Sequence, residues 1–112
     1  TALREAGYRV YDAASGEDSV TLYKKHMDRI NLSIVDVVMP GKDGKHVLEE
    51  ILRIDPTAPI IMSSGFSRDY VRGYLERGAW TFIQKPYDQA LLLAVVRRVL
   101  DQKTARQKAS AG

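Results

Sequence analysis

The chain has 112 residues, no cysteine and a formal net charge of +3, and 45% of its residues are hydrophobic. This length predicts one domain with a buried core. The absence of cysteine excludes disulfides, thiolate catalysis and cysteine-based zinc sites. No apolar run approaches the ~20 residues that cross a bilayer, and no signal peptide opens the sequence, so we expect a cytoplasmic protein without membrane contact.

The first segments predict a helix end, a strand and a helix. Residues 1–6 end at Gly7, a residue type common just past the end of a helix. Side-chain polarity alternates with a period of two over residues 8–13. These residues are also rich in aromatic and β-branched side chains, and both features favour a strand. Ser15 then predicts the N-cap of a helix that runs to about Met27.

The middle of the chain alternates between buried strands and helices. Residues 32–38 and 59–62 are short apolar runs, typical of parallel strands that are covered on both faces. A loop rich in Pro and Gly follows the first run, over residues 39–44. The helix after it has an apolar stripe and ends before Pro56.

The last part of the chain predicts two more helices and one more strand. Residues 67–77 form a helix that Ser67 caps and Gly78 ends, and residues 80–84 form a strand. Asp88 caps a final helix that reaches about Gln102.

Much of the positive charge lies near the end of the chain, on Arg97, Arg98, Lys103, Arg106 and Lys108. No helix-turn-helix or RNA-binding motif accompanies these residues. We therefore predict a solvated helix end, a disordered, polar and basic tail over residues 103–112, and no direct contact with nucleic acid.

This order of elements predicts an α/β fold in which a parallel sheet carries helices on both faces. Asp36, Ser64 and Lys85 fall at the carboxyl ends of three successive strands. The carboxyl ends of parallel strands meet at one edge, where ligands bind. A carboxylate nucleophile with an ammonium and a hydroxyl beside it suits phosphoryl transfer. A divalent cation would normally be needed as well, because phosphate and carboxylate repel each other.

Several stretches together resemble the receiver domain of response regulators, from the first residue to about Gln102. They are residues 34–40 with Asp43 and Gly44, residues 59–65, Gly78 with Ala79, and residues 82–87. The resemblance implies a flavodoxin-like, doubly wound sheet with the family strand order 2-1-3-4-5.

The resemblance also implies a role for each polar residue at the strand ends. Asp36 becomes the phosphoacceptor, which takes a phosphoryl group from the phosphohistidine of a histidine kinase or phosphotransfer protein. Ser64 becomes the switch hydroxyl, and Lys85 the phosphate-binding lysine, with a cis bond to Pro86. Asp36 and the carbonyl of Val38 become ligands of Mg²⁺. Without the resemblance, a capping or turn role for Asp36 is equally well supported.

The resemblance extends to the output side of the domain. Phe82 stands where the family has its switch aromatic. The last helix is apolar around most of its circumference, which predicts either a broad contact with the core or a partner-facing surface with a possible homodimer. Trp80 and Tyr74 are candidates for the same surface.

His26 and His46 are expected at the surface, away from the site.

One part of the family pattern is absent from the sequence. Receivers begin with a hydrophobic strand that ends in an acidic pair, and strand 1 is not present here. We expect a gap between the strands that start near Tyr8 and Leu32, and an incomplete magnesium site. Either the receiver domain of residues 1–102 is N-terminally incomplete, or another chain or segment fills the gap.

Three functional contexts stay open. The domain is a stand-alone regulator or the C-terminal receiver of a hybrid histidine kinase. In either context it only phosphorylates and dephosphorylates itself and is not a turnover enzyme. The alternative is an interaction module that never takes phosphate and binds partners through its last helix.

Overall fold

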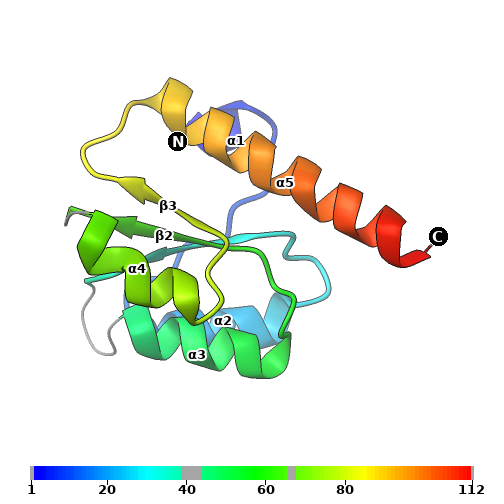
Figure 1. The fold of residues 1–112 in the computed structure, drawn as a ribbon, viewed down its shortest axis with the longest axis horizontal. Coiled ribbons are helices and arrows are strands. Elements are labelled where there is room, and N and C mark those ends of the chain that lie inside the picture. Colours follow the sequence, from blue (N-terminus) through cyan, green and yellow to red (C-terminus); the bar gives the residue numbers. More distant parts are fainter. Residues whose placement is uncertain (1, 39–43, 66–67, 112) are drawn as a thin grey trace.

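A parallel sheet lies between two layers of helices (Figure 1) in the part of the chain that the structure describes, residues 2–38, 44–65 and 68–111. This structure is a computed structural model. Its elements are, in chain order, α1 (Ala2–Glu5), α2 (Gly16–His26), β1 (Ser33–Asp36), α3 (Gly44–Ile54), β2 (Ile60–Ser64), α4 (Arg68–Glu76), β3 (Thr81–Gln84) and α5 (Gln89–Ala111). The described strands have the order β1-β2-β3.

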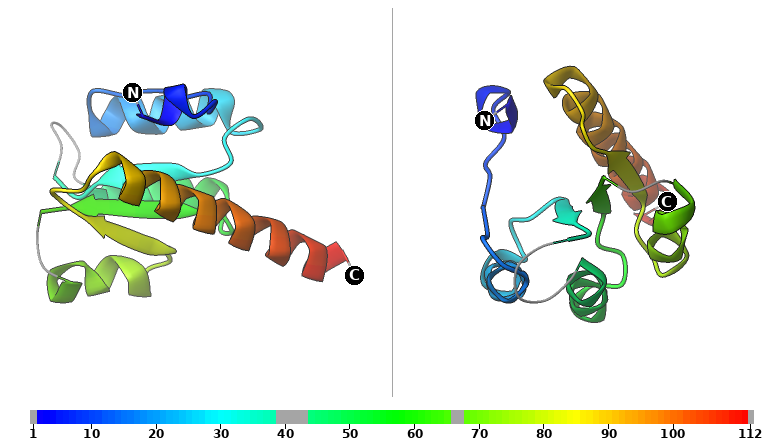
Figure 2. Two further views of the ribbon diagram at one scale, coloured as in Figure 1. Left: turned by 90° about the horizontal axis from the view of Figure 1, so that it is seen from above. Right: turned by 90° about the vertical axis from the view of Figure 1, so that its left-hand side faces the viewer.

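The helices cover both faces of the sheet. In Figures 1 and 2, α1 and α5 lie on one face, and α2, α3 and α4 lie on the other. All described strand pairs are parallel, with Asp36 opposite Ser63 and Ser64 opposite Gln84. This arrangement confirms the predicted α/β fold, because parallel strands joined by helices need helices on both faces.

The core has two parts, one on each face of the sheet. The α3-side core includes Val35, Leu48, Ile60 and Met62, and the α5-side core is built by Ile61, Ile83, Val96 and Val99. Neighbouring residues of β2 alternate between the two parts, as the pleat of a strand requires. The central strand is therefore buried on both faces, which explains its continuous apolar sequence.

Most predicted helix ends are confirmed. The side chains of Ser15 and Asp88 each accept a hydrogen bond from the backbone N–H three residues later, at 3.2 and 2.8 Å. Gly7 and Gly78 have φ angles of +97° and +124°, a region that favours glycine. The predicted cap Ser67 and residues 39–43 of the loop predicted over residues 39–44 lie outside the described residues, and Gly44, the last residue of that predicted loop, begins α3.

Residues 8–13 do not form the predicted strand. A cavity of ≈ 690 Å³ separates this segment from β1, and among the described residues no strand pairs with it. Alternation along a sequence favours an extended backbone, but a strand also needs a hydrogen-bonded neighbour. The prediction was wrong because that neighbour is missing from the described part of the chain.

The polar C-terminal segment is helical, which corrects the prediction of a disordered tail. Helix α5 runs to Ala111 and projects beyond the sheet (Figure 1). The Arg106 guanidinium carbon lies 3.9 Å from the centroid of the Trp80 ring, and Lys103 Nζ donates to Asn31 Oδ1 at 3.1 Å. Extending an existing helix needs no new nucleus, and Lys, Gln, Arg and Ala are good helix formers.

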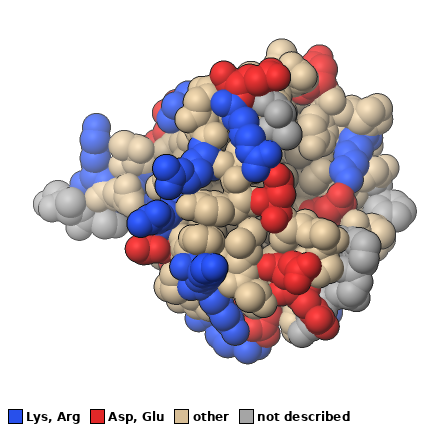
Figure 3. Space-filling view, turned by 180° about the vertical axis from the view of Figure 1, so that it is seen from behind, with Lys and Arg blue, Asp and Glu red and all other residues tan. Residues whose placement is uncertain are grey.

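No described helix is both long enough and apolar enough to span a membrane. On the face seen in Figure 3, basic and acidic side chains lie next to one another. The positive charge of the chain is therefore partly offset on that face.

Ser63 carries a buried hydroxyl without a hydrogen-bond partner among the described residues. The residue is 3% exposed and belongs to β2, the central one of the described strands. Because a buried, unpaired hydroxyl lowers stability, we expect Ser63→Ala to leave the free energy of unfolding unchanged or raise it by up to about 1 kcal/mol. Urea unfolding of the two proteins measures this difference.

Thr57 provides the control for this prediction. Its hydroxyl donates to Asp55 Oδ1 at 2.8 Å, so Thr57→Val removes a hydrogen bond that is made. We expect this variant to lose about 0.5–1 kcal/mol. A larger loss from Ser63→Ala than from Thr57→Val would show that the Ser63 hydroxyl has a partner in solution.

Candidate functional site

The three polar residues predicted from the strand ends meet at the carboxyl edge of the sheet. Asp36 ends β1, Ser64 ends β2, and Lys85 follows β3 directly. The backbone N–H of Lys85 donates to the carbonyl of Ser64 at 2.7 Å, which extends the β2–β3 ladder by one step. The predicted convergence is therefore confirmed by the geometry, because the strands are parallel and adjacent.

Asp36 and Lys85 form an ion pair across β2. Lys85 Nζ contacts Asp36 Oδ2, and the two side chains are 42% and 37% exposed. The other carboxylate oxygen of Asp36, Oδ1, accepts the backbone N–H of Val38 at 3.3 Å. The bond between Lys85 and Pro86 is cis, as predicted. This arrangement presents a half-exposed carboxylate to solvent with a cation beside one of its oxygens, and such a cation can also offset negative charge on a phosphoryl group that binds there.

Ser64 lies deeper than the other two residues. It is 1% exposed, and it shares the pleat of β2 with Met62 in the α3-side core. The predicted hydroxyl role of Ser64 stays a prediction. Phe82, the predicted switch aromatic, is partly buried and packs against the same α3-side core.

The residues predicted to bind magnesium do not make a complete site. Asp36 brings one carboxylate, which Lys85 already contacts, and Val38 is exposed two residues past the end of β1. Within the described ranges, no group of three or more His, Asp or Glu side chains is placed to hold a metal ion. Mg²⁺ needs near-octahedral coordination by oxygen, so these donors alone do not fit it.

Gly44 shapes the site in a way that the sequence did not indicate. Its N–H donates to the carbonyl of Val37 at 3.1 Å. A Cβ at this position would lie 2.5 Å from the Asp36 carbonyl oxygen and 2.8 Å from Val37 Cα. Only glycine lets the start of α3 approach the end of β1 this closely. The sequence marked Gly44 as a loop residue and as part of the family pattern, but not as a point of close contact, because close approach is a property of the folded chain.

We expect Gly44→Ala to lower the free energy of unfolding by about 1–3 kcal/mol, because the added methyl group must push the strand end that carries Asp36. Gly73 in α4 is the matched control, since a Cβ there would meet nothing within 4 Å. Gly73→Ala should raise stability by about 0.5–1 kcal/mol. Thermal unfolding compares the variants, and equal responses to the two substitutions would contradict this account of Gly44.

The remaining candidates lie elsewhere. The His26 ring stacks on Tyr11, with ring centroids 4.2 Å apart, and His46 Nε2 lies 3.8 Å from Glu50 Oε1. A further carboxylate, that of Asp12 in the segment between α1 and α2, pairs with Arg4 at 2.9 Å. None of these pairs involves the three strand-end residues.

Comparisons with known proteins agree with the geometry. Residues 1–97 match the model of the response regulator receiver domain. The protein CcdB of Bacillus subtilis is 39% identical over 100 residues, which are 88% of this chain and 82% of CcdB. The sensor kinase CckA of Brucella abortus is 29% identical over 91% of this chain, which spans only 11% of that kinase.

A solved structure has the same fold. A chain of the CheX–CheY–BeF₃–Mg²⁺ complex from Borrelia burgdorferi superposes with a TM-score of 0.82 and 37% identity, over 88% of this chain and 75% of that one. The family match covers most of the sequence, and the sheet places Asp36 and Lys85 at its carboxyl edge. This chain belongs to the response regulator receiver domains of two-component systems.

Proposed function

We propose that this chain takes a phosphoryl group from a phosphohistidine onto Asp36 and then changes the surface around α5. The observation that carries the proposal is the Asp36–Lys85 pair at the carboxyl edge of the sheet. Receiver domains interact with histidine kinases and phosphotransfer proteins, so the donor belongs to that class. The Borrelia complex, which contains BeF₃ and Mg²⁺, supports a phosphoryl ligand for the same fold.

The transfer is a displacement at phosphorus. A carboxylate oxygen of Asp36 attacks, the bond from phosphorus to the imidazole nitrogen of the donor breaks, and the imidazole leaves with the bonding electron pair. The Lys85 ammonium offsets negative charge on the phosphoryl oxygens, and the Ser64 hydroxyl donates a hydrogen bond to one of them. Receiver domains generally bind Mg²⁺, and such an ion, if Asp36 and the carbonyl of Val38 helped to hold it, would lower the repulsion between phosphate and carboxylate.

Phosphorylation of Asp36 changes the structure from the carboxyl edge of the sheet to α5. Ser64 moves toward the phosphoryl group, and Phe82 moves into the space beside it. This repacking shifts the population of the surface formed by α5 and its neighbours. Leu91 on α5 is 47% exposed and marks an apolar contact point, which suits a partner or a second copy of the domain. Both open contexts, a stand-alone regulator and the receiver of a hybrid kinase, use this mechanism.

The second candidate is an interaction module that takes no phosphate. The incomplete set of metal ligands among the described residues favours it. In this case α5 binds its partner without any reaction at Asp36.

Incubation with acetyl phosphate and Mg²⁺ separates the two functions. The first predicts a mass gain of one phosphoryl group per chain, which hydroxylamine removes because an acyl phosphate is labile to it. A phosphoryl group that resists hydroxylamine would indicate a hydroxyl acceptor. No mass gain at all, in a folded chain, would favour the interaction module.

A further inference from the structure

A small groove lies between α3 and α4, in the helical layer that is opposite α5 (Figures 1 and 2). Its volume is ≈ 160 Å³, and it is lined by Lys45 from α3 and by Tyr70, Gly73, Tyr74 and Arg77 from α4 and the residue that follows it. Pockets that enclose whole small-molecule ligands have volumes of about 300–1,000 Å³. The groove therefore fits a single side chain of a larger partner.

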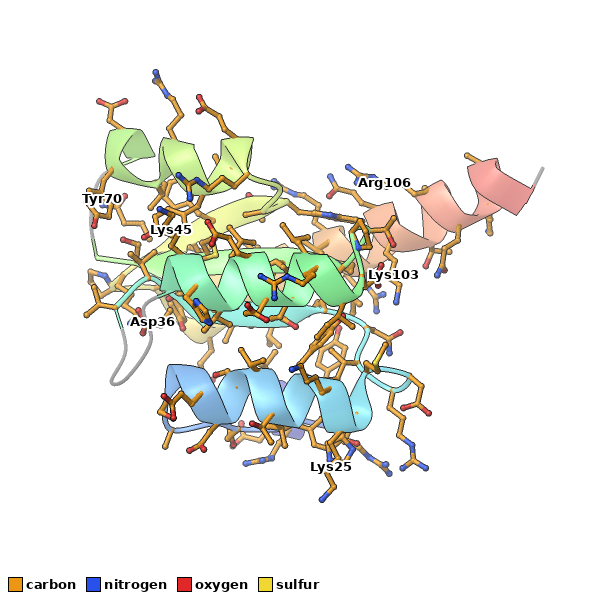
Figure 4. The ribbon with its side chains drawn as sticks, turned by 90° about the horizontal axis from the view of Figure 1, so that it is seen from below. Lys25, Asp36, Lys45, Tyr70, Lys103 and Arg106 are labelled. Atoms are coloured by element: carbon orange, nitrogen blue, oxygen red, sulfur yellow. The ribbon has the colours of Figure 1, made fainter. Side chains whose placement is uncertain are left out.

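The groove carries one cation at each end. In Figure 4, Lys45 and Tyr70 lie close together, at the end of the two helices that is nearer to Asp36. Arg77 comes seven residues after Tyr70, which is ~10 Å farther along the helix axis. No described acidic residue lines the groove. An occupant therefore meets positive charge on both sides of its centre.

Both cations are available to a partner. Arg77 pairs with Glu49 at 2.8 Å, and the two side chains are 46% and 47% exposed. Exposed pairs of this kind contribute little to stability, and a guanidinium has five N–H donors, so Arg77 can bind a second carboxylate. No ion pair joins Lys45 to another described residue.

Gly73, in the middle of the groove, is not explained by the packing of the described chain. It lies inside α4 without a positive φ angle, and a Cβ there would meet nothing within 4 Å. Glycine in a helix is less stable than alanine. Tyr70, Tyr74 and Arg77 lie on the same side of α4 as Gly73, because residues three and four apart are neighbours on a helix. The glycine leaves the helix backbone open between the two tyrosines, where a partner can approach closely.

We propose that the groove between α3 and α4 is the docking site for an acidic peptide segment of a partner protein. One apolar side chain of the segment lies over Gly73, between Tyr70 and Tyr74. Carboxylates on either side of that side chain pair with Lys45 and Arg77. Because α5 covers the opposite face of the sheet, a partner bound here leaves the surface around α5 free.

Other peptide chemistries match the groove less well. An uncharged apolar segment would cover the Lys45 ammonium without supplying a partner for it, which is unfavourable. A basic segment would bring like charges together. A small inorganic anion matches the charges but leaves the surface over Gly73 and the tyrosines uncovered. An acidic segment with one apolar side chain satisfies both parts of the groove.

The test is binding of a dye-labelled peptide, Ala-Glu-Glu-Leu-Glu-Glu-Ala, to the whole chain, measured by fluorescence anisotropy. We expect saturable binding, and we expect the peptide to shift the backbone NMR signals of Gly73 and Arg77. The same peptide with glutamine in place of every glutamate keeps the apolar side chain but loses the charge. It is expected to bind at least about tenfold more weakly.

Two arginines of the same helix region provide a matched pair of variants. Arg77 lines the groove and pairs with Glu49, whereas Arg72 pairs with Asp69 at 3.3 Å and does not line the groove. Arg77→Gln and Arg72→Gln change the net charge equally, and each breaks one exposed ion pair. Arg77→Gln should weaken binding by at least about fivefold, and Arg72→Gln should leave it within about twofold of the parent chain.

Gly73→Leu tests the groove without removing any charge. The leucine side chain fills the space over α4, so we expect binding to weaken by at least about tenfold. Leucine is a better helix former than glycine, so this variant should unfold at the same temperature as the parent chain or above it. Loss of binding in such a variant cannot result from unfolding.

Four results would overturn the proposal. They are the absence of saturable binding to the parent chain, equal binding of the glutamine peptide, equal weakening by Arg72→Gln and Arg77→Gln, and unchanged binding to Gly73→Leu. A doubled molecular mass of the chain alone, which Gly73→Leu abolishes, would also overturn it, because a second copy would then be the occupant. Labelling of Asp36 is not used in any of these measurements, so they stand independently of the proposed function.

Discussion

Replacing Asp36 with asparagine is expected to abolish labelling of the chain by acetyl phosphate. The amide of asparagine is not a nucleophile toward phosphorus, and it cannot form the ion pair with Lys85 that the carboxylate forms. Intact mass spectrometry, after incubation with acetyl phosphate and Mg²⁺, should show one phosphoryl group on the parent chain and none on Asp36→Asn.

Asp12 provides the matched control. It is an exposed carboxylate that lines the same cavity as Asp36, but it pairs with Arg4 instead of Lys85. Asp12→Asn should therefore be labelled like the parent chain. If Asp36→Asn is labelled as fast as Asp12→Asn, then Asp36 is not the acceptor.

Replacing Lys85 with methionine is expected to slow the labelling of Asp36 by about 10²–10³-fold, as for other donors that stabilise developing charge. Methionine keeps the length and much of the volume of the side chain but has no positive charge. Initial rates of labelling by acetyl phosphate, measured for both proteins at one concentration, give this ratio.

Lys85→Arg tests whether a positive charge alone is sufficient. The planar guanidinium is a different donor from the compact ammonium, so we expect this variant to recover only part of the rate. Lys45→Met is the control, because Lys45 lies at the same end of the molecule as Asp36 in Figure 4, whereas the ion pair with Asp36 is made by Lys85. Equal slowing by Lys45→Met and Lys85→Met would mean that general positive charge, and not this pair, promotes the reaction.

The site was predictable because each of its polar residues can be recognised from the few residues around it in the sequence. Asp36 lies near the end of a short apolar run and Lys85 directly follows a predicted strand, and parallel strands bring such positions to one edge. The structure confirms that edge and the ion pair across it. The cis bond before Pro86 followed from the family resemblance rather than from any pattern of polarity.

The errors came from features that depend on neighbours in space. Residues 8–13 have a strand-like sequence, but a strand is completed only by a partner, which the described chain does not provide. The C-terminal segment was predicted to be disordered because it is polar. In the structure it continues α5, where Arg106 stacks on Trp80.

Two other features were not predicted, for the same reason. The close approach of Gly44 to the end of β1 and the unpaired hydroxyl of Ser63 appear only when distant segments are packed together. Neither residue type is unusual at its position in the sequence. Such features depend on contacts between distant segments and have to be found in three dimensions.

The most direct measurement of the central claim is chemical mapping of the phosphoryl group. Borohydride reduces an aspartyl phosphate to homoserine, so reduction after labelling marks the acceptor permanently. Peptide mass spectrometry should then find homoserine at position 36 in the labelled chain and aspartate there in the unlabelled chain. Homoserine at another aspartate, or a phosphoryl group retained on a serine or histidine after reduction, would contradict the assignment of Asp36.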